Sequence, residues 1–535
     1  MAARGITPVT AALRSTLAAH GVAQRTGIPV EEVLAGGTAS AMAGPSRRDV
    51  LKAAGAAVAG ATLGGTLPAS RANAATNPSV LVVGAGLAGL RAAHYLWRVK
   101  GIAATVYEGN NRAGGRCYSL RDYFPGMVVE HGGQLINIGH NAIRNLASSL
   151  GLSMDPVYGG SYGGMVDKYR IDGADYPHDA ANADWGEVYY AMRNAQRAAP
   201  YPQTFDNHTD AGNALDNMTV NQWLDANVPG GLSSRFAKLM QSNAVAEYGL
   251  DPDQQSALNL IYLLGWNSQN SLDPLNGSDE KYVVRGGNDQ LVTRMLDQLP
   301  AGTVRYGNRL VAVKQNANGS VRCSFKVGNK VSDVTADRVV LALPFSTLRD
   351  ADLTQSGFSS VTLRAIRELD LGANAKIHVG VSRRPWVEQG FGGAAYTNLS
   401  GFQCGWDDSV NFPLPAGAFV FFPGGRQVSD GWSGATHGTA PAAQVSAYLA
   451  QLEPMFPGVT AAYTGKAFRD FWWSNPWSKG AYTCPMPGQY TTLFGAGAVP
   501  EGNVHFAGEH TSLLYFGYLN GAVETGERAA RAVAG

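Results

Sequence analysis

Cysteine is scarce in this 535-residue chain, and blocks of like charge are absent. The four cysteines stand far apart, with no CxxC pair and no Cys/His cluster at zinc spacing, so we expect neither a disulfide framework nor a metal site. They are Cys117, Cys323, Cys404 and Cys484. Charged residues make up only 16% of the chain and nearly cancel, to a net charge of +1, which argues against nucleic acid as a partner.

The composition is otherwise that of a folded globular protein. Hydrophobic residues reach 45%, and a chain of this length predicts two or three domains rather than one core. The 66 glycines follow no Gly-X-Y period, so a collagen-like structure is excluded.

The N-terminal segment has the pattern of an export signal. Arg47 and Arg48 precede an uncharged, weakly apolar stretch from Ala53 to Leu67, and a small-x-small site at Ala72-Asn73-Ala74 follows. The paired arginines resemble the twin-arginine type of signal, which carries folded proteins to the periplasm or outside the cell. The Gly/Ala-rich stretch is too short and too weakly apolar to span a membrane, so we expect no transmembrane segment.

A dinucleotide-binding turn follows directly. Ser79 to Val83 is a short apolar run that predicts a buried parallel strand, and Leu90 to Val99 predicts a helix. Between them stand Gly84, Gly86 and Gly89 in G-x-G-x-x-G spacing. In this context the glycines give the tight turn, the close approach of a pyrophosphate and the close packing of helix on strand.

An acidic residue stands where a ribose would need it. The run from Ala104 to Tyr107 predicts a second strand, and Glu108 ends it 19 residues beyond Gly89. A carboxylate at about this spacing hydrogen-bonds the ribose hydroxyl of a bound dinucleotide. Strand, turn, helix, strand and acid together therefore predict a dinucleotide site.

The residues after Glu108 narrow the choice of dinucleotide. Glu108 with Gly114-Gly115-Arg116 resembles the E-x5-G-G-R signature of the flavin-containing amine oxidase superfamily. The resemblance implies FAD, with Gly115 approaching the diphosphate and Arg116 neutralising it.

Further motifs of that superfamily occur in order over nearly all of residues 79–535. Val129 to Gln134 resembles the loop beside the flavin, which implies contacts from Gly133 and Gln134. Tyr282 to Asn288 resembles the turn that returns the chain to the FAD domain, and the strand Leu310 to Val313 implies that Val311 meets the adenine. Val339 to Pro344 resembles another strand end of the family.

The C-terminal motif is the most specific part of the resemblance. Val504 to Thr511, followed by Gly517 to Ala522, implies that Gly508 and Glu509 face the ribityl-pyrophosphate and that Leu519 lies beside the flavin ring. A segment from Trp472 to Tyr482 resembles the one that brings an aromatic ring to the flavin. Tyr482 and Tyr518 would then be the two catalytic walls of an aromatic cage.

We accordingly expect an α/β fold with a discontinuous Rossmann-like FAD-binding domain and a mixed-sheet substrate-binding domain that carries a helical cap. The expected boundaries are 1–74 for the signal and N-terminal extension, 75–135, 280–345 and 465–535 for the FAD-binding domain, and 136–279 and 346–464 for the substrate-binding domain. The cap is predicted as helices at Trp185–Ala198, Thr219–Ala226, Leu232–Ala246 and Pro252–Leu264.

Two departures from the family pattern bear on the chemistry. Ala481 stands where relatives with covalent flavin carry cysteine, which predicts non-covalent FAD. The stretch Arg349 to Leu353 lacks the lysine that many relatives place near the flavin, and Lys376 is assigned to a later strand, which leaves fast reaction with dioxygen open.

The resemblance implies an oxidase that converts a small amine to an imine, then to an aldehyde or ketone and ammonia, and passes electrons to dioxygen to give hydrogen peroxide. Leu135 to His140 contains no arginine to pair with a substrate carboxylate, which favours an amine over an amino acid. Three alternatives stay open: an L-amino acid oxidase, a dehydrogenase with another electron acceptor, and a non-catalytic flavoprotein. A homodimer is a further expectation.

Overall fold

The computed structural model describes residues 77–535 except 158–164, 275–278 and 414. The expected signal and its two arginines lie outside the described residues. All four cysteines are described, buried and free of disulfides, as the sequence predicts. Among the described residues no helix is both long and apolar enough to cross a membrane.

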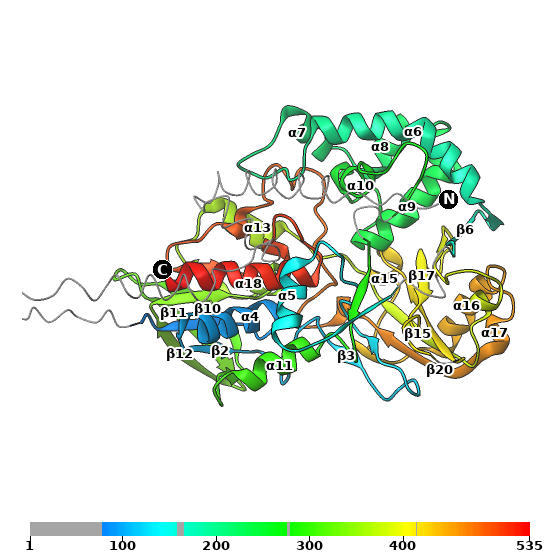
Figure 1. The fold of residues 1–535 in the computed structure, drawn as a ribbon. Coiled ribbons are helices and arrows are strands. Elements are labelled where there is room, and N and C mark those ends of the chain that lie inside the picture. The colour runs from blue at the N-terminus through cyan, green and yellow to red at the C-terminus, as the bar shows by residue number, and fades with distance from the viewer. Residues whose placement is uncertain (1–76, 158–164, 275–278, 414) are drawn as a thin grey trace, which may run out of the picture. The chain divides into compact units, whose positions relative to one another are not determined.

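A parallel five-stranded sheet carries the dinucleotide turn (Figure 1). Its strand order is β21 (Val504–Phe506), β13 (Arg338–Leu341), β1 (Val80–Val83), β2 (Ala104–Tyr107) and β9 (Val304–Arg305), with every neighbouring pair parallel. The central strand β1 is buried along its whole length, which is why its sequence is continuously apolar rather than alternating.

Successive side chains of β1 enter two different cores, because neighbouring residues of a strand point to opposite faces. Val80 and Val82 pack against helices. These helices are α4 (Leu87–Tyr95), α5 (Asn141–Ser149), α11 (Gln290–Gln298) and α18 (Leu519–Ala534). Leu81 and Val83 pack toward a four-stranded sheet. Its order is β12 (Lys330–Ala336), β11 (Val321–Val327), β10 (Arg309–Gln315) and β14 (Asp352–Gln355).

A mixed eight-stranded sheet forms the other large layer. Its order is β19 (His437–Thr439), β20 (Tyr463–Asp470), β15 (Lys376–Val381), β18 (Gly417–Phe422), β17 (Cys404–Asp407), β16 (Ala395–Thr397), β6 (Lys168–Ile171) and β7 (Ala174–Asp175). All pairs are antiparallel except β16 with β6. Its helices α16 (Ala442–Leu452) and α17 (Val459–Ala462) contribute to one apolar core with β15, β18 and β20.

Five helices form the predicted cap, grouped together in teal to green in Figure 1. They are α6 (His178–Ala198), α7 (Asp210–Asp216), α8 (Val220–Asn227), α9 (Arg235–Tyr248) and α10 (Ala257–Leu264). Of these, α9 contacts β6, β16 and β17 of the eight-stranded sheet. The four helices expected from the sequence are confirmed, with ends that differ by a few residues and a longer α6.

The remaining elements are short. They are the hairpin β3 (Ser119–Leu120) and β4 (Val129–Glu130), the pair β5 (Met154–Pro156) and β8 (Tyr282–Val284), and the helices α12 (Phe345–Leu348), α13 (Ser360–Glu368), α14 (Pro385–Glu388) and α15 (Arg426–Ser429).

The expected α/β class with a parallel and a mixed sheet is confirmed. The expected domain boundaries stay a prediction, and the packing differs from them in three places. Helix α5 packs in the core of the parallel sheet, α13 packs in the core shared with the four-stranded sheet, and the boundary at residue 465 falls inside β20. Local sequence does not show these assignments, because a helix with one apolar stripe can pack on either domain.

Candidate cofactor and substrate site

One cavity gathers most of the residues singled out in the sequence. It has an open volume of about 1350 Å³, counting space that opens to solvent. The predicted residues that line it are Gly84, Gly86, Glu108, Gly115, Arg116, Gly133, Tyr482, Gly508, Glu509, Tyr518 and Leu519. They come from six separate stretches of the chain, so the fold brings together what the sequence keeps up to 435 residues apart.

The glycine turn after β1 is shaped to receive a group at the start of α4. A Cβ on Gly86 would meet no protein atom within 4 Å, so a side chain there would occupy open cavity space. A Cβ on Gly89 would stand 1.9 Å from the Gly84 carbonyl oxygen, so this glycine serves the packing of helix on strand. The first turn of α4 presents backbone N–H groups and positive dipole charge, which suit a phosphate.

Glu108 lies at the carboxyl end of β2 and faces the same cavity. Its carboxylate accepts hydrogen bonds from the backbone N–H of Ala85 at 2.6 Å and of Asn110 at 2.8 Å. Burial raises the pKa of Glu108, and these hydrogen bonds oppose that shift. The position and the fixed carboxylate fit a ribose-binding acid.

An ion pair joins three distant segments at the cavity wall. Arg116 donates from Nη1 to Glu509 Oε1 at 2.9 Å and to the Ala481 carbonyl at 2.6 Å, and Glu509 Oε2 accepts the Gly517 N–H at 2.6 Å. Burial alone would raise the pKa of Glu509, but Arg116, His510 and the Gly517 N–H together hold it below its ordinary value. The pair therefore stays ionised and fixes the wall on either side of Tyr482 and Tyr518.

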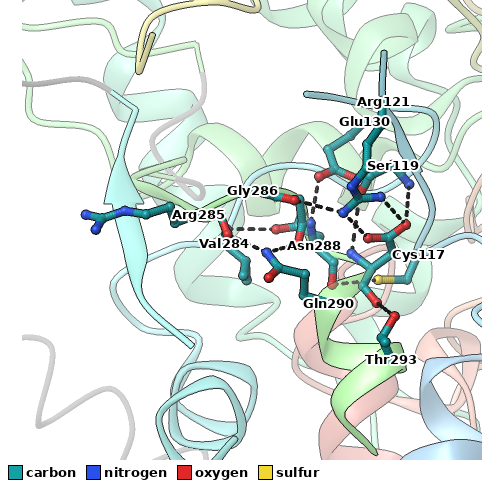
Figure 2. Close-up of polar contacts among 12 residues, drawn as sticks. Cys117, Ser119, Arg121, Glu130, Val284, Arg285, Gly286, Asn288, Gln290 and Thr293 are labelled. Carbon is teal, nitrogen blue, oxygen red and sulfur yellow. Dashed lines mark hydrogen bonds and ion pairs between the residues drawn. The ribbon is translucent and has the colours of Figure 1, made fainter. Parts of the chain in front are cut away.

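A polar cluster around Glu130 and Asn288 holds the loop from Glu130 to Gln134 (Figure 2 shows the contacts of these two residues). The Glu130 carboxyl accepts hydrogen bonds from Ser119 Oγ at 2.8 Å and from the Asn288 N–H at 2.7 Å. The Asn288 amide donates to the carbonyls of Gly133 and Gln134 and accepts from the Val284 N–H. These bonds use the Asn288 side chain to hold the loop, so it is not free for a ligand.

Burial raises the pKa of the Glu130 carboxyl to about 8, which favours its neutral form at neutral pH. Asp289, by contrast, pairs with Arg121 at 2.6 Å beside it. Figure 2 also shows Arg285 pointing away from this cluster, and its guanidinium pairs with Asp155.

The two tyrosines of the predicted cage line the cavity and are anchored to one cap helix. Tyr482 Oη donates to the Ala246 carbonyl at 3.0 Å, and Tyr518 Oη donates to Glu247 Oε1 at 2.9 Å. Both acceptors lie in the last turn of α9. The cap therefore sets the positions of both rings.

Glu247, which is not among the residues that line the cavity but accepts a hydrogen bond from one of them, is a candidate that sequence reasoning missed. Burial raises the pKa of Glu247 to about 7, and the Tyr518 hydroxyl opposes that shift. No Lys or Arg among the described residues pairs with Glu247, and none of these residues donates to its Oε2. A sequence signal would have been the single acid near the end of a helix whose other charged residues, Arg235 and Lys238, are basic.

Three predicted cofactor residues lie outside the cavity lining. Gly89 is used in the packing described above. The Gln134 amide group hydrogen-bonds Asp408 and Lys376. In the segment that contains Val311, the residues that line the cavity are Asn308, Arg309 and Leu310. The pairing register of β10 with β11 shifts between Leu310 and Ala312, and the local sequence does not predict this shift. For the residues in the cavity, a role as cofactor ligands stays a prediction.

The chain is similar to known proteins over most of its length. Residues 87–534 match the family described as flavin containing amine oxidoreductase. A "Putative L-amino-acid oxidase YobN" of Bacillus subtilis (strain 168) is 25% identical over 471 residues, which cover 84% of this chain and 93% of the relative. The "Nicotine dehydrogenase" of Pseudomonas putida (strain DSM 28022 / S16) is 27% identical over 522 residues, 92% of this chain and 97% of the relative.

A solved structure shows the same fold. The cyclohexylamine oxidase from Brevibacterium oxydans IH-35A has a TM-score of 0.73 and 22% identity, and the match covers 86% of this chain and 99% of that one.

Proposed function

Since this chain belongs to the family of flavin-containing amine oxidoreductases, we propose that it binds FAD non-covalently and oxidises a small amine that lacks an α-carboxylate. Dioxygen is the proposed electron acceptor, with release of hydrogen peroxide. The observation that carries the choice of substrate is the hydrogen bond from Tyr518 to Glu247, an acid without a cationic partner among the described residues.

FAD is supported by the donor set of the cavity. The start of α4 with Gly86 suits a diphosphate, Glu108 suits a ribose, and Arg116 adds a cation to the same wall. Bound flavin would supply the two-electron redox chemistry, which no side chain of the protein can provide.

Non-covalent binding is supported by the residues around Tyr482. Ala481 lines the cavity and has no atom that could bond the cofactor. The nearby Cys484 is fully buried, and burial raises the pKa of its thiol, so it is a poor nucleophile. Its Sγ lies against the Asn259 amide, outside the cavity lining.

The protein's own side chains would bind and prepare the amine. Tyr482 and Tyr518 orient it, and their aromatic faces attract its ammonium form. Glu247 pairs with the ammonium and accepts one of its protons at Oε2, giving the neutral amine and a neutral carboxyl group. A pKa of about 7 suits this exchange, because the acid can both take up and release the proton near neutral pH.

A carboxylate on the substrate would be unfavourable beside Glu247, which would repel it, and Arg116 of the cavity wall is already paired with Glu509. Arg285 is largely exposed, and its guanidinium pairs with Asp155. An unpaired charge in a buried site is strongly destabilising.

The test is a matched pair of substrates, tyramine against tyrosine and tryptamine against tryptophan, with peroxide as the readout. We expect the amines to have the higher kcat/KM. A tenfold preference for the amino acids, about 1.4 kcal/mol of transition-state preference, would replace the proposal by an L-amino acid oxidase. Flavin that is bleached by amine under anaerobic conditions but reoxidised slowly by air would identify a dehydrogenase instead.

Export is a separate proposal, supported by the paired arginines and the small-x-small site. Replacing Arg47 and Arg48 by lysine should retain the protein in the cytoplasm. Undiminished export of that variant would contradict the twin-arginine assignment.

A further inference from the structure

A buried chain of polar and ionised side chains connects the Glu130–Gln134 loop to the eight-stranded sheet. It begins at Lys376, the first residue of β15, which is 4% exposed. Lys376 Nζ donates to the Glu130 carbonyl at 2.9 Å, to the Gly132 carbonyl at 3.0 Å and to Gln134 Oε1 at 2.9 Å. Three acceptors match the three protons of the ammonium group, so this lysine is committed to the loop.

Gln134 links Lys376 to Asp408. Because its Oε1 accepts from Lys376, its Nε2 must face the other way, and it donates to Asp408 Oδ1. The other oxygen of Asp408 lies 2.8 Å from His378 Nδ1. Lys376 and His378 stand two residues apart on β15, on the same face of the sheet.

His378 lies between two carboxylates. Its Nε2 lies 3.4 Å from Asp470 Oδ2, an ion-pair separation without a hydrogen bond, and the side chains of His378, Asp408 and Asp470 are fully buried. Burial alone would lower the pKa of His378, but the two aspartates raise it above its ordinary value. The ring is therefore an imidazolium over part of the physiological pH range.

Asp470 closes the chain. Its Oδ1 lies 2.7 Å from His131 Nδ1 and 2.6 Å from His437 Nδ1. These are hydrogen-bonding distances, so no metal ion fits between the three groups as they stand. When His378 is protonated, it and Lys376 are the cations that face Asp408 and Asp470.

We propose that His378 is a positioning residue for the cofactor cavity: it holds Asp408, and through Asp408 and Gln134 it fixes the loop whose Gly133 forms part of the cavity wall. Asn288 holds the backbone carbonyls of Gly133 and Gln134, and the charged chain holds the Glu130 and Gly132 carbonyls and the Gln134 side chain. Removing the imidazolium would leave two buried carboxylates with one cation, which is strongly unfavourable. The inference rests on the proposed binding of FAD in this cavity.

The pH dependence follows from the charges. The charged groups that act on His378 are Asp408 and Asp470, with His131 and His437 bound to Asp470. Lys376 acts on both aspartates and couples to Glu130 and Glu280. Because the folded-state pKa of His378 is raised, its stabilising contribution is complete below about pH 6.5 and is lost as pH rises through the folded value. The raised pKa of Glu130, about 8, gives a loss in the same direction, so the two must be separated by mutation.

The experiment measures the unfolding temperature of the FAD-free protein and its FAD affinity from about pH 6 to about pH 9. The proteins are the wild type, His378→Gln, Asp408→Asn and the matched control Glu130→Gln. We expect the wild type and the control to lose affinity for FAD as pH rises. His378→Gln should bind FAD about tenfold more weakly at the acidic end and approach the wild type at the alkaline end.

Asp408→Asn keeps the shape of the chain and should show the same loss of pH dependence, so the test stands even where His378→Gln folds poorly. The proposal is overturned if either variant keeps the wild-type pH dependence of both readouts. Failure of the wild type to bind FAD would instead contradict the proposed function, while the unfolding measurement on the FAD-free protein would still decide whether the chain of charges exists.

Discussion

The acids of the cavity wall and the acid that anchors Tyr518 have their charges compensated differently. On the dinucleotide side, Glu509 is paired with Arg116, and Glu108 is held by two backbone N–H groups. Glu247, next to the cavity lining, accepts from a single group among the described residues, the Tyr518 hydroxyl. On the dinucleotide side both acids already have partners, and the first turn of α4 still presents N–H groups to an anion. Glu247 is a buried acid that a cation would stabilise. The first arrangement suits an anionic diphosphate, and the second suits a cationic amine.

The largest test of this contrast is a pair of glycine variants. Gly89→Ala should destabilise the FAD-free protein by about 3 kcal/mol, because its Cβ would overlap the Gly84 carbonyl. Gly86→Ala should change the unfolding free energy by less than about 1 kcal/mol but weaken FAD binding, because its Cβ would enter only cavity space. Urea unfolding and FAD titration measure both. Equal effects on FAD-free stability would remove the distinction between packing and binding glycines.

The next effect is expected at Glu247. Glu247→Gln should lower kcat/KM for amines about 100-fold, or about 2.7 kcal/mol, because the neutral amide neither pairs with the ammonium nor accepts its proton. In the wild type, kcat/KM should fall as pH drops through about 7, where Glu247 becomes protonated, and the variant should lack this acidic limb. FAD content, read from the visible spectrum, should be unchanged. A variant that keeps both the rate and the limb would assign Glu247 to packing.

Tyr518 allows a finer comparison. Tyr518→Ala should lower kcat/KM about tenfold with FAD still bound, because it removes substrate positioning and not cofactor contacts. Tyr518→Phe is its control: it keeps the ring but leaves Glu247 without its hydrogen bond, so the acidic limb should move to higher pH. Unchanged kinetics in Tyr518→Ala would place this ring outside the substrate site.

The smallest expected change concerns the bond to the cofactor. Acid precipitation of the wild type should leave the yellow chromophore in the supernatant and a polypeptide of unmodified mass, because Ala481 cannot attach a flavin. A mass raised by one flavin would make Cys484 the attachment site. It would also require a movement of that buried thiol into the cavity.

The sequence alone predicted most of the structure where a site is formed by residues close together in the chain. The strand, the turn of Gly84, Gly86 and Gly89, the helix and Glu108 are all encoded within 29 residues, and the structure has each element in place. The cap helices were predicted for a similar reason, since apolar residues at helical spacing reveal a helix whatever it packs on. The sequence singled out Arg116, Glu509 and the two tyrosines, which line the cavity, because each stands in a contiguous motif.

Groups whose partners lie far away in the sequence could be identified only from the tertiary structure. Glu247 reaches Tyr518 across 271 residues, and Lys376 reaches the Glu130 carbonyl across 246. Gln134 was predicted to contact the cofactor, but its amide group hydrogen-bonds Lys376 and Asp408. The physical reason is that a charge in a folded protein is controlled by what burial brings next to it, and no local pattern records that neighbour.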